Sequence, residues 1–441
     1  GTTTLDKIVA LVRNAQENKA SGERISSWFG QKYTVFVLLA FAISLGLRTA
    51  TGATDAFYQS LILLVALSPC AVVISSPATT LSALAWAARN GVLIRGGEFI
   101  ESMGKIDTAV MDKTGTLTAG KPKLVEICVC SGVPEHIGGT TLCVDSHACW
   151  AGKGEMSEEA LDVLRRAAIA EQYSSHPIAE AIVQAARERG LDIPEATEQV
   201  SIAGMGVRAR VANLEIRVGQ RRFFETEQPL EADFAVHTEE LQARGMTVAI
   251  LESEGKWAAL GLRDEPKPKT LENLKELRSL GITRILMLTG DTHQTAAAVA
   301  GELEISEFKG GLLPDDKTRI VSELEAEGRK TLMVGDGIND APSLARATVG
   351  VAMGGLGSDV ALNAADIVLM QDRLDRLPQL VRLGRKTNAT IRANLIFAAT
   401  VIVGLAVSSL FFQLPLPLAV VGHEGSTVLV ILNGLRLLAG P

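Results

Sequence analysis

An aspartate at the end of an apolar run is the residue best suited to do chemistry in this sequence. Residues 106–111 predict a short buried strand, and Asp112-Lys113-Thr114-Gly115-Thr116 follows it directly. Open α/β sheets bind ligands at the carboxyl ends of their strands. A carboxylate there can attack a phosphoryl group, while Gly115 allows close backbone approach and nearby N–H and hydroxyl groups bind oxygens. The pattern favours an aspartyl phosphate on Asp112 over the alternative of an ordinary turn.

Two further loops carry matching chemistry. An apolar run at 286–288 ends in Thr289-Gly290-Asp291, and another at 332–334 ends in a Gly/Asp turn that contains Asp336 and Asp340. We expect the three strand ends to converge on one phosphate. Asp336 and Asp340 would supply hard oxygen ligands for Mg²⁺, and Lys317 a cation for the transferring oxygens. Charge neutralisation of this kind is most of what phosphoryl transfer requires.

Two glycine motifs are rejected as nucleotide fingerprints. Residues 115–121 match the Gly-x4-Gly-Lys part of a Walker A loop, but Pro122 stands where Ser or Thr should hold Mg²⁺. Gly204-Met205-Gly206 is too short for a dinucleotide fingerprint and lacks its third glycine.

A second group of reactive side chains lies inside apolar runs. Pro69 in Ser68-Pro69-Cys70 should open its helix and expose carbonyls, a hydroxyl and a soft thiol to a cation, although a simple kinked core helix is the alternative. His423-Glu424-Gly425-Ser426-Thr427 places an imidazole and a carboxylate in another apolar run. Such groups are costly in lipid, so they indicate function more than neutral packing of Glu424 against Ser68.

Four apolar runs must position this chemistry. They cover residues 33–47, 56–88, 393–412 and 414–438, and the first is marginal for a bilayer that needs about 20 residues. The short connections carry only Arg48. Basic residues flank the ends that face the large middle block: Lys32, Arg89, Arg95, Arg385, Lys386 and Arg392. By the positive-inside rule this block is cytoplasmic, which predicts a multi-pass protein of the inner or plasma membrane.

The composition agrees with a membrane protein that has a large soluble part. The 441 residues are 47% hydrophobic with a formal net charge of -7, and no long basic run is present, which argues against nucleic acid as a partner. Five cysteines, an odd number, do not resemble a secreted disulfide framework and favour a reducing compartment. The middle block alternates strand-like and helical patterns, which predicts a parallel α/β domain, and its pattern changes between Pro122 and Arg263 as if a second domain were inserted.

The whole set resembles the P-type ATPases of the haloacid dehalogenase superfamily, whose signature Asp-Lys-Thr-Gly-Thr-Leu-Thr stands at 112–118. The resemblance implies that ATP phosphorylates Asp112 with Mg²⁺ as cofactor. It implies membrane helices plus a haloacid dehalogenase-like, Rossmann-type α/β domain with an inserted α+β nucleotide-binding domain. The implied phosphate site is Lys113, Thr114, Thr289, Gly290, Asp291 and Lys317, and Asp112, Thr114, Asp336 and Asp340 would hold Mg²⁺.

In the inserted region, Glu171 and Ser174-Ser175-His176-Pro177 resemble the nucleotide-binding motif of the heavy-metal branch. The resemblance implies that His176 lies near the adenine, that Gly204 and Gly206 close over it, and that Gly219 belongs to the same site. Taken alone, His176-Pro177 is more typical of a helix-capping turn. The chain departs from the branch at Ser175, Gln220 and Lys267, where Glu, Asn and Arg are common.

The pairing of Ser-Pro-Cys with His-Glu-Gly resembles the branch of heavy-metal (type IB) pumps associated with cobalt and related divalent ions. The implied ligands are Ser68, Cys70, His423, Glu424 and Thr427. This mixed S/N/O set favours Co²⁺, with Zn²⁺, Fe²⁺, Cd²⁺ and Ni²⁺ as alternatives, over Cu⁺. Protonation of Glu424 would weaken binding during release or return a proton. A regulatory metal site is one interpretation of the cluster Cys128, Cys130, His136, Cys143, His147 and Cys149, but its spacing fits no zinc pattern, so cysteines without a role are favoured.

The resemblance divides the chain into a connector at 1–32, two spans at 33–88, a phosphorylation domain at 89–121 and 264–388, a nucleotide-binding domain at 122–263 and two spans at 389–441. No actuator domain is visible, and Ser21-Gly22-Glu23 only superficially resembles its Thr-Gly-Glu loop. We therefore expect the chain to start after that domain, to depend on it and on further membrane helices, and to be monomeric. The alternatives are a membrane-tethered phosphatase and a non-catalytic metal sensor; Thr114, where such phosphatases place an acid, disfavours the first.

Overall fold

The computed structural model describes residues 21–130, 147–152, 154–174, 176–202, 205–211, 214–225, 232–336, 340–354, 364–412 and 414–441. The chain divides into two compact units. One comprises Gly1–Val110, Glu272–Arg284 and Pro314–Pro441, and the other comprises Met111–Leu271 and Ile285–Leu313.

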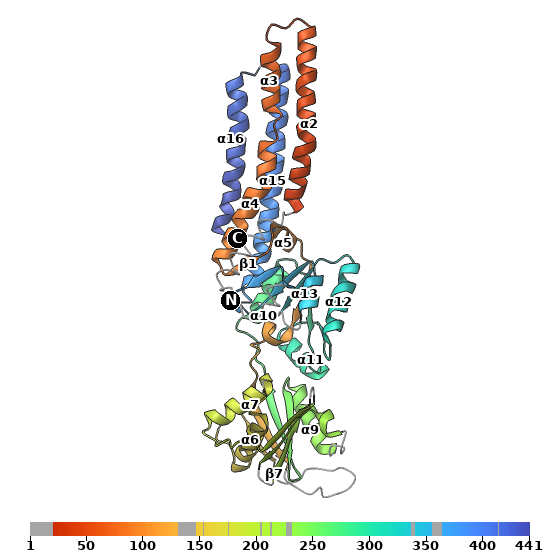
Figure 1. Cartoon of the computed structure of the whole chain (residues 1–441), viewed down its shortest axis with the longest axis vertical. Coiled ribbons are helices and arrows are strands. Elements are labelled where there is room, and N and C mark those ends of the chain that lie inside the picture. The colour runs from red at the N-terminus through yellow and green to blue at the C-terminus, as the bar shows by residue number, and fades with distance from the viewer. Residues whose placement is uncertain are drawn as a thin grey trace. The chain divides into compact units, whose positions relative to one another are not determined.

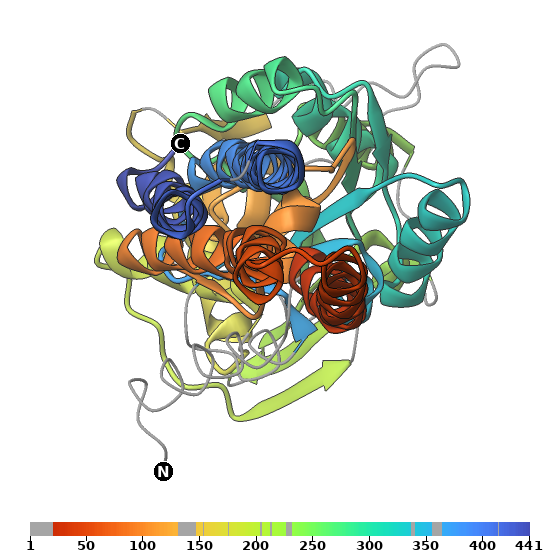
Figure 2. The same cartoon turned by 90° about the horizontal axis from the view of Figure 1, so that it is seen from above.

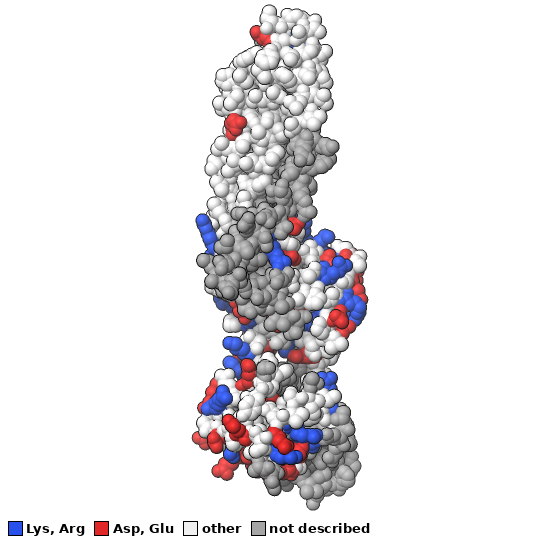
Figure 3. Space-filling view, in the orientation of Figure 1, with Lys and Arg blue, Asp and Glu red and all other residues white. Residues whose placement is uncertain are grey.

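The first unit contains a bundle of long apolar helices (Figures 1 and 2). The helices are α2 (Ser21–Ala50), α3 (Ala56–Ala66), α4 (Cys70–Arg89), α15 (Arg376–Phe411) and α16 (Leu416–Leu435), followed by the short 3-10 helix η3 (Arg436–Ala439). Four segments are long and apolar enough to cross a membrane: Tyr33–Ala50, Ala56–Arg89, Arg376–Phe411 and Leu416–Ala439. In Figure 3 the visible face of the bundle is almost free of charged side chains. The predicted four spans are confirmed.

The second predicted span is two helices. Helix α3 ends at Ala66 and α4 begins at Cys70, with Pro69 at the N-cap position of α4. Proline has no N–H and clashes with the preceding turn, which kinks or breaks a helix, and here the helix is broken. The predicted opening at Pro69 is therefore confirmed. Pro77, in contrast, lies inside α4 without ending it.

The parallel α/β sheet has seven strands in the order β1-β14-β13-β12-β2-β10-β11. Strands β10 and β11, β12 and β13, and β13 and β14 pair in parallel, while β1 runs antiparallel to β14. The strands are β1 (Val92–Ile94), β2 (Thr108–Asp112), β10 (Arg284–Leu288), β11 (Glu307–Lys309), β12 (Thr331–Gly335), β13 (Val349–Ala352) and β14 (Ile367–Leu369). Its helices are α5 (Gly97–Met103), α10 (Thr270–Ser279), α11 (His293–Glu302), α12 (Pro314–Ala326) and α13 (Ala341–Arg346). Strands β2 and β12 are buried along their whole length, as expected for the centre of a sheet covered on both faces.

The inserted region is an antiparallel sheet with helices on both faces. Its order is β4-β3-β9-β8-β7-β6-β5. The strands are β3 (Lys123–Cys130), β4 (His147–Ala151), β5 (Glu198–Ile202), β6 (Gly206–Val211), β7 (Leu214–Gly219), β8 (Thr247–Ser253) and β9 (Lys256–Arg263). Helices α6 (Glu158–Glu171) and α7 (Pro177–Glu188) pack on one face around Ile127 and Leu260, and α8 (Arg221–Glu225) and α9 (Ala232–Ala243) pack on the other around Ile250 and Ala259. The alternation of these core residues along each strand produces the two apolar faces.

Candidate functional site

Asp112 is the last residue of β2, and the loop after it turns back sharply. Asp112 is 5% exposed, and the following segment η1 (Lys113–Leu117) contains Gly115 at φ 72°. The N–H and hydroxyl groups of Thr118 both donate to the carbonyl of Lys113, at 3.0 and 2.9 Å. A positive φ costs glycine little but is strained for other residues, so Gly115 is required for this turn. The loop therefore holds Asp112 at a strand end, as the sequence predicts, and its role as the nucleophile stays a prediction.

A carboxylate that the sequence did not single out fixes the same loop. Asp264 accepts hydrogen bonds from the Thr118 hydroxyl at 2.5 Å and from the backbone N–H groups of Gly120 and Lys121 at 3.2 and 3.3 Å. Lys267 donates to the carbonyl of Gly115. These partners lie about 150 positions apart in the chain, so the local sequence pattern could not predict their hydrogen bonds. The sequence offered one indication, an aspartate directly after strand β9.

Lys113 forms an ion pair with Asp291, which follows β10. Lys113 is 4% exposed, so its ammonium group is largely removed from water and depends on this carboxylate. The Asp291 N–H donates to the hydroxyl of buried Thr289 at 3.1 Å, next to Gly290. The structure thus brings together four residues that the sequence assigned to the phosphate site.

A second buried ion pair joins Lys317 and Asp340, 2.7 Å apart. Burial raises the pKa of Asp340, while the charge of Lys317 and its hydrogen bond act in the opposite direction. The second carboxylate oxygen, Oδ2, is buried and has no hydrogen-bond partner among the residues that the structure describes, which exclude 337–339. A Cβ on Gly335 would lie 2.4 Å from this oxygen, so only glycine fits there. A buried acceptor without a donor suits a hard cation, and Asp340 therefore fits the expected Mg²⁺ ligand.

The remaining parts of the predicted phosphate site are placed less completely. Asp336 is half-buried at the end of β12, and residues 337–339 of its loop lie outside the described part of the chain. In the sheet order, β2 is the neighbour of both β12 and β10. Convergence of the three strand ends on one phosphate, and the role of Thr114, stay predictions.

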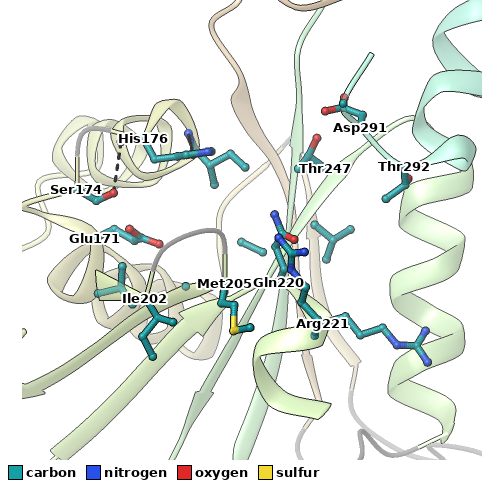
Figure 4. Close-up of a pocket in the computed structure, with 18 of the residues that line it drawn as sticks. Glu171, Ser174, His176, Ile202, Met205, Gln220, Arg221, Thr247, Asp291 and Thr292 are labelled. Carbon is teal, nitrogen blue, oxygen red and sulfur yellow. Dashed lines mark hydrogen bonds between the residues drawn. The ribbon is translucent and has the colours of Figure 1, made fainter. Parts of the chain in front are cut away.

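A cavity of about 530 Å³ lies in the second unit. Glu171, Ser174 and His176 line one side, and Asp291 and Thr292 line the other (Figure 4). Its remaining lining includes Ile202, Met205, Gly206, Gly219, Gln220 and Thr247. A pocket of this size can hold a nucleotide-sized ligand. It contains four of the five residues proposed for nucleotide binding, and Gly204 lies outside the described residues.

His176 forms the helix cap that the sequence offered as the alternative, and it also lines the cavity. Its Nδ1 accepts a hydrogen bond from the N–H of Ile178 at 3.3 Å, which caps helix α7, while the residue also lines the cavity. The N–H of His176 donates to the Ser174 hydroxyl at 3.3 Å. The cap fixes the position of the imidazole without removing it from the pocket.

Gly206 and Gly219 face each other across strands β6 and β7. A Cβ on Gly206 would lie 2.3 Å from the carbonyl oxygen of Val218, and one on Gly219 would lie 2.6 Å from the carbonyl oxygen of Met205. Real Cβ atoms do not approach backbone so closely, so both positions require glycine. The two glycines let the backbone form this wall of the cavity.

Burial raises the pKa of Glu171 from its ordinary value of 4.5 to about 7, against the opposing hydrogen bond of Ser174. Between these values the folded state keeps a proton that the unfolded state has released, so the free energy of unfolding should fall as the pH rises from 4.5 to 7. We expect Glu171→Gln to remove this dependence and to raise the free energy of unfolding relative to wild type by up to about 3 kcal/mol at pH 8. Urea unfolding followed by tryptophan fluorescence at pH 5.5 and 8 measures the difference.

An exposed glutamate of the same helix provides the control for this prediction. Glu159 lies in the first turn of α6, and Glu159→Gln should leave the wild-type dependence on pH in place. If Glu171→Gln changes the free energy of unfolding equally at both pH values, the pH dependence does not come from Glu171.

The intramembrane residues form two local pairs. The Ser68 hydroxyl and the Cys70 thiol lie 3.1 Å apart at the break between α3 and α4, and Cys70 is exposed. His423 is buried in α16, with its Nε2 3.9 Å from Oε1 of Glu424, whose side chain is 65% exposed. The hydroxyl of Thr427 donates to the His423 carbonyl at 3.3 Å. Among the described residues no group of three or more His, Cys, Asp and Glu side chains could hold a metal. A single ligand set built from both pairs therefore stays a prediction.

The cysteine-rich stretch is partly a strand. Cys128 is buried in β3, opposite Cys149 of β4, and Cys130 is opposite His147. His136 and Cys143 lie outside the described residues.

Comparison with known proteins identifies the chain's relatives. The haloacid dehalogenase-like hydrolase family matches residues 106–348. A probable cobalt/nickel-exporting P-type ATPase of Mycolicibacterium smegmatis is 36% identical over 99% of this chain and 63% of its own length. A zinc-transporting ATPase of Bacillus subtilis is 36% identical over 98% of this chain and 64% of its own length. The chain thus spans less than two thirds of these curated relatives.

Solved structures agree with the sequence relatives. The crystal structure of a zinc-transporting PIB-type ATPase in the E2.Pi state matches with a TM-score of 0.73 and 36% identity, covering 99% of this chain and 67% of that one. The catalytic domain of the CPx-ATPase CopB-B matches 67% of this chain and 97% of its own length, with a TM-score of 0.50 and 31% identity. The chain therefore belongs to the haloacid dehalogenase-like hydrolases and, among them, to the PIB-type ATPases.

Proposed function

We propose that the protein uses ATP to export a divalent transition-metal ion across a membrane through an aspartyl phosphate on Asp112. The observation that carries the proposal is the double role of Asp291. This residue lines the cavity that contains Glu171 and His176, and it also pairs with Lys113, the chain neighbour of Asp112. A nucleotide bound by Glu171 and His176 would therefore extend its phosphates toward residues in direct contact with the nucleophile's loop.

The chemistry at this site is a phosphoryl transfer followed by hydrolysis. A carboxylate oxygen of Asp112 attacks the γ-phosphorus, the bond from phosphorus to the β,γ-bridging oxygen breaks, and ADP leaves with that electron pair. Water later hydrolyses the acyl phosphate, which restores Asp112 and releases phosphate. Lys113 and Lys317 offset negative charge on the transferring oxygens. Asp336 and Asp340 would hold Mg²⁺, which when bound neutralises phosphate charge.

The transported ion is proposed from the donor set. A thiol at Cys70, an imidazole at His423 and oxygens at Ser68, Glu424 and Thr427 form a mixed set that suits borderline divalent ions. The relatives' names include cobalt/nickel and zinc among the exported metals. We favour Co²⁺, with Zn²⁺, Cd²⁺, Ni²⁺ and Fe²⁺ as the alternatives.

A membrane-tethered phosphatase is the rival function. Phosphatases of this superfamily place an acid two residues after the nucleophile to protonate the leaving group, and this chain has Thr114 there. Threonine cannot act as that acid, so a phosphoenzyme formed on Asp112 would persist long enough to be coupled to transport.

ATPase activity of the full-length protein in lipid, measured with Co²⁺, Zn²⁺, Cd²⁺, Ni²⁺, Fe²⁺ and Cu⁺ in turn, separates these functions. We expect stimulation by divalent ions, strongest with Co²⁺, and none with Cu⁺. Phosphate release that no metal stimulates would favour the phosphatase.

A further inference from the structure

Helix α4 has its polar side chains inside and its apolar side chains outside. Its buried residues are small or carry hydroxyl groups: Ala71, Ser75, Ser76, Thr79, Thr80, Ser82, Ala83 and Ala87. Val73, Ile74 and Leu81 are 38%, 40% and 49% exposed. The buried face packs against α15 and α16. A membrane helix does not need hydroxyl groups for solubility, so a row of them in the interior requires another explanation.

The hydroxyl groups of α4 fall into two classes. Thr79 donates to the Ser75 carbonyl and Ser82 donates to the Ala78 carbonyl, both at 2.7 Å, as serine and threonine commonly do in helices. Ser75 and Ser76 are 0% exposed and Thr80 is 3% exposed, yet their hydroxyl oxygens have no hydrogen-bond partner within the described part of the chain. These three side chains follow Cys70 by 5, 6 and 10 positions, or about 8, 9 and 15 Å along the helix axis.

Neighbouring polar groups do not satisfy these hydroxyls. The Asn394 side chain of α15 donates to the Val430 carbonyl at 3.2 Å and accepts from Asn433 of α16 at 2.8 Å. The Thr387 hydroxyl of α15 is itself buried without a partner. Pro77 adds to the shortage of donors, because it lacks the N–H that would normally bond the Val73 carbonyl.

A small apolar layer separates these groups from the outer half of the bundle. Ala71, Ala398 and Val430, from three different helices, pack together there and are 2%, 0% and 1% exposed. Cys70 adjoins Ala71 on one side of this layer, and the unpartnered hydroxyls lie on the other, toward Arg89.

We propose that water molecules fill the interior between α4 and helices α15 and α16, from Thr80 to Ser75, and lead a hydrated divalent cation from the Arg89 end of α4 as far as the apolar layer at Ala71, next to Cys70. Buried hydroxyls in an apolar medium demand partners, and water supplies both donors and acceptors at each of the three positions. Oxygen-only groups suit a cation that still carries water, whereas the thiol of Cys70 suits one that has shed it. The cation route rests on the proposed export function; the hydration of the helix interior does not.

Close helix packing is the competing explanation, because small residues let membrane helices approach each other. A Cβ on Gly434 of α16 would lie 2.9 Å from Oγ1 of Thr79, which shows how tight one contact is. Packing alone requires small volume but no hydroxyl. It therefore predicts that removal of the hydroxyl at constant volume has no effect.

Accessibility to a charged thiol reagent tests the hydration directly. In the full-length protein in liposomes, Ser76→Cys and Thr80→Cys should react with a trimethylammonium methanethiosulfonate at least about tenfold faster than Ile74→Cys and Leu81→Cys, because the reagent and the thiolate require water. Peptide mass spectrometry assigns the modified residue and separates it from Cys70. Equal, slow reaction at all four positions would show a dry interior and overturn the proposal.

Metal uptake tests the route. At limiting Co²⁺ or Zn²⁺, Ser76→Ala and Thr80→Val should slow initial uptake about tenfold, which corresponds to a rise of about 1.4 kcal/mol in the activation free energy. Ser82→Ala, which removes a hydroxyl already bonded to its own helix, should not slow it. Phosphorylation by inorganic phosphate should be unchanged in all three. Uptake at the wild-type rate in Ser76→Ala and Thr80→Val would refute the route. If the cysteine variants react with the thiol reagent but no protein, wild type included, takes up metal, the export function is refuted and the hydrated interior is still supported.

Discussion

Asp112→Asn is expected to abolish the phosphoenzyme and to lower metal-stimulated ATP hydrolysis by at least about 10³-fold. The asparagine side chain has nearly the same shape but cannot attack phosphorus, so the change removes the nucleophile and leaves its loop intact. The measurement is acid-stable labelling of the protein by ATP carrying radioactive γ-phosphate, followed by release of the label with hydroxylamine, which cleaves acyl phosphates.

The same strand provides a matched control for this substitution. Asp107 precedes β2, where its carboxylate accepts hydrogen bonds from the Thr108 hydroxyl at 2.6 Å and the Lys330 N–H at 3.3 Å. Asp107→Asn should keep the phosphoenzyme, although it weakens these contacts. Nucleotide binding to the cavity should persist in Asp112→Asn. Hydroxylamine-sensitive label on Asp112→Asn would assign the nucleophile to another residue.

The strand ends that carry Asp112, Asp291 and Asp336 were predictable because their signals are local. Asp112, Asp291 and Asp336 each follow an apolar run of three or four residues, and such runs ending in Gly/Asp turns are typical of parallel strands. Pro69 predicted the break between α3 and α4 for an equally local reason. The ion pair of Lys113 with Asp291 joins residues 178 positions apart, and only the convergence of strand ends made it foreseeable.

Other features depend on tertiary structure and could not be predicted. Asp264 binds the turn at Thr118 because β9 ends beside it, which no sequence period encodes. The raised pKa of Glu171 follows from burial at the end of α6. The unpartnered hydroxyls of α4 are visible only when the hydrogen bonds of Thr79 and Ser82 can be compared with those of Ser76 and Thr80. The exposure of Cys70 and Glu424 likewise required the helix positions.

Each of the two lysines predicted to lie at the phosphate is paired with a carboxylate, Lys113 with Asp291 and Lys317 with Asp340. The lysine side chains are only 5% and 9% exposed, so removal of either carboxylate would leave a buried ammonium group without this partner, at a substantial cost in stability.

Ser68→Cys is expected to shift the metal response from divalent ions toward Cu⁺. The Ser68 hydroxyl lies 3.1 Å from the Cys70 thiol, so a thiol at position 68 would place two soft donors side by side at the break between α3 and α4. Soft ligands select Cu⁺, whereas a single thiol among N and O donors does not. We expect the ratio of Cu⁺-stimulated to Co²⁺-stimulated ATPase activity to rise at least about tenfold.

Two further substitutions distinguish a change in ligands from a change in structure. Ser68→Ala removes the hydroxyl without adding a soft donor, so it should weaken the divalent response and leave the Cu⁺ response absent. Cys70→Ser leaves only hard and borderline donors and should lower stimulation by thiophilic Cd²⁺ more than stimulation by Co²⁺. Phosphorylation by inorganic phosphate, which needs Asp112 but no metal loading, should be retained in all three variants. If Ser68→Cys retains phosphorylation but is stimulated by the same metals as the wild type, the metal selectivity does not depend on the break between α3 and α4. His423 and Glu424 of α16 would then be the next residues to examine.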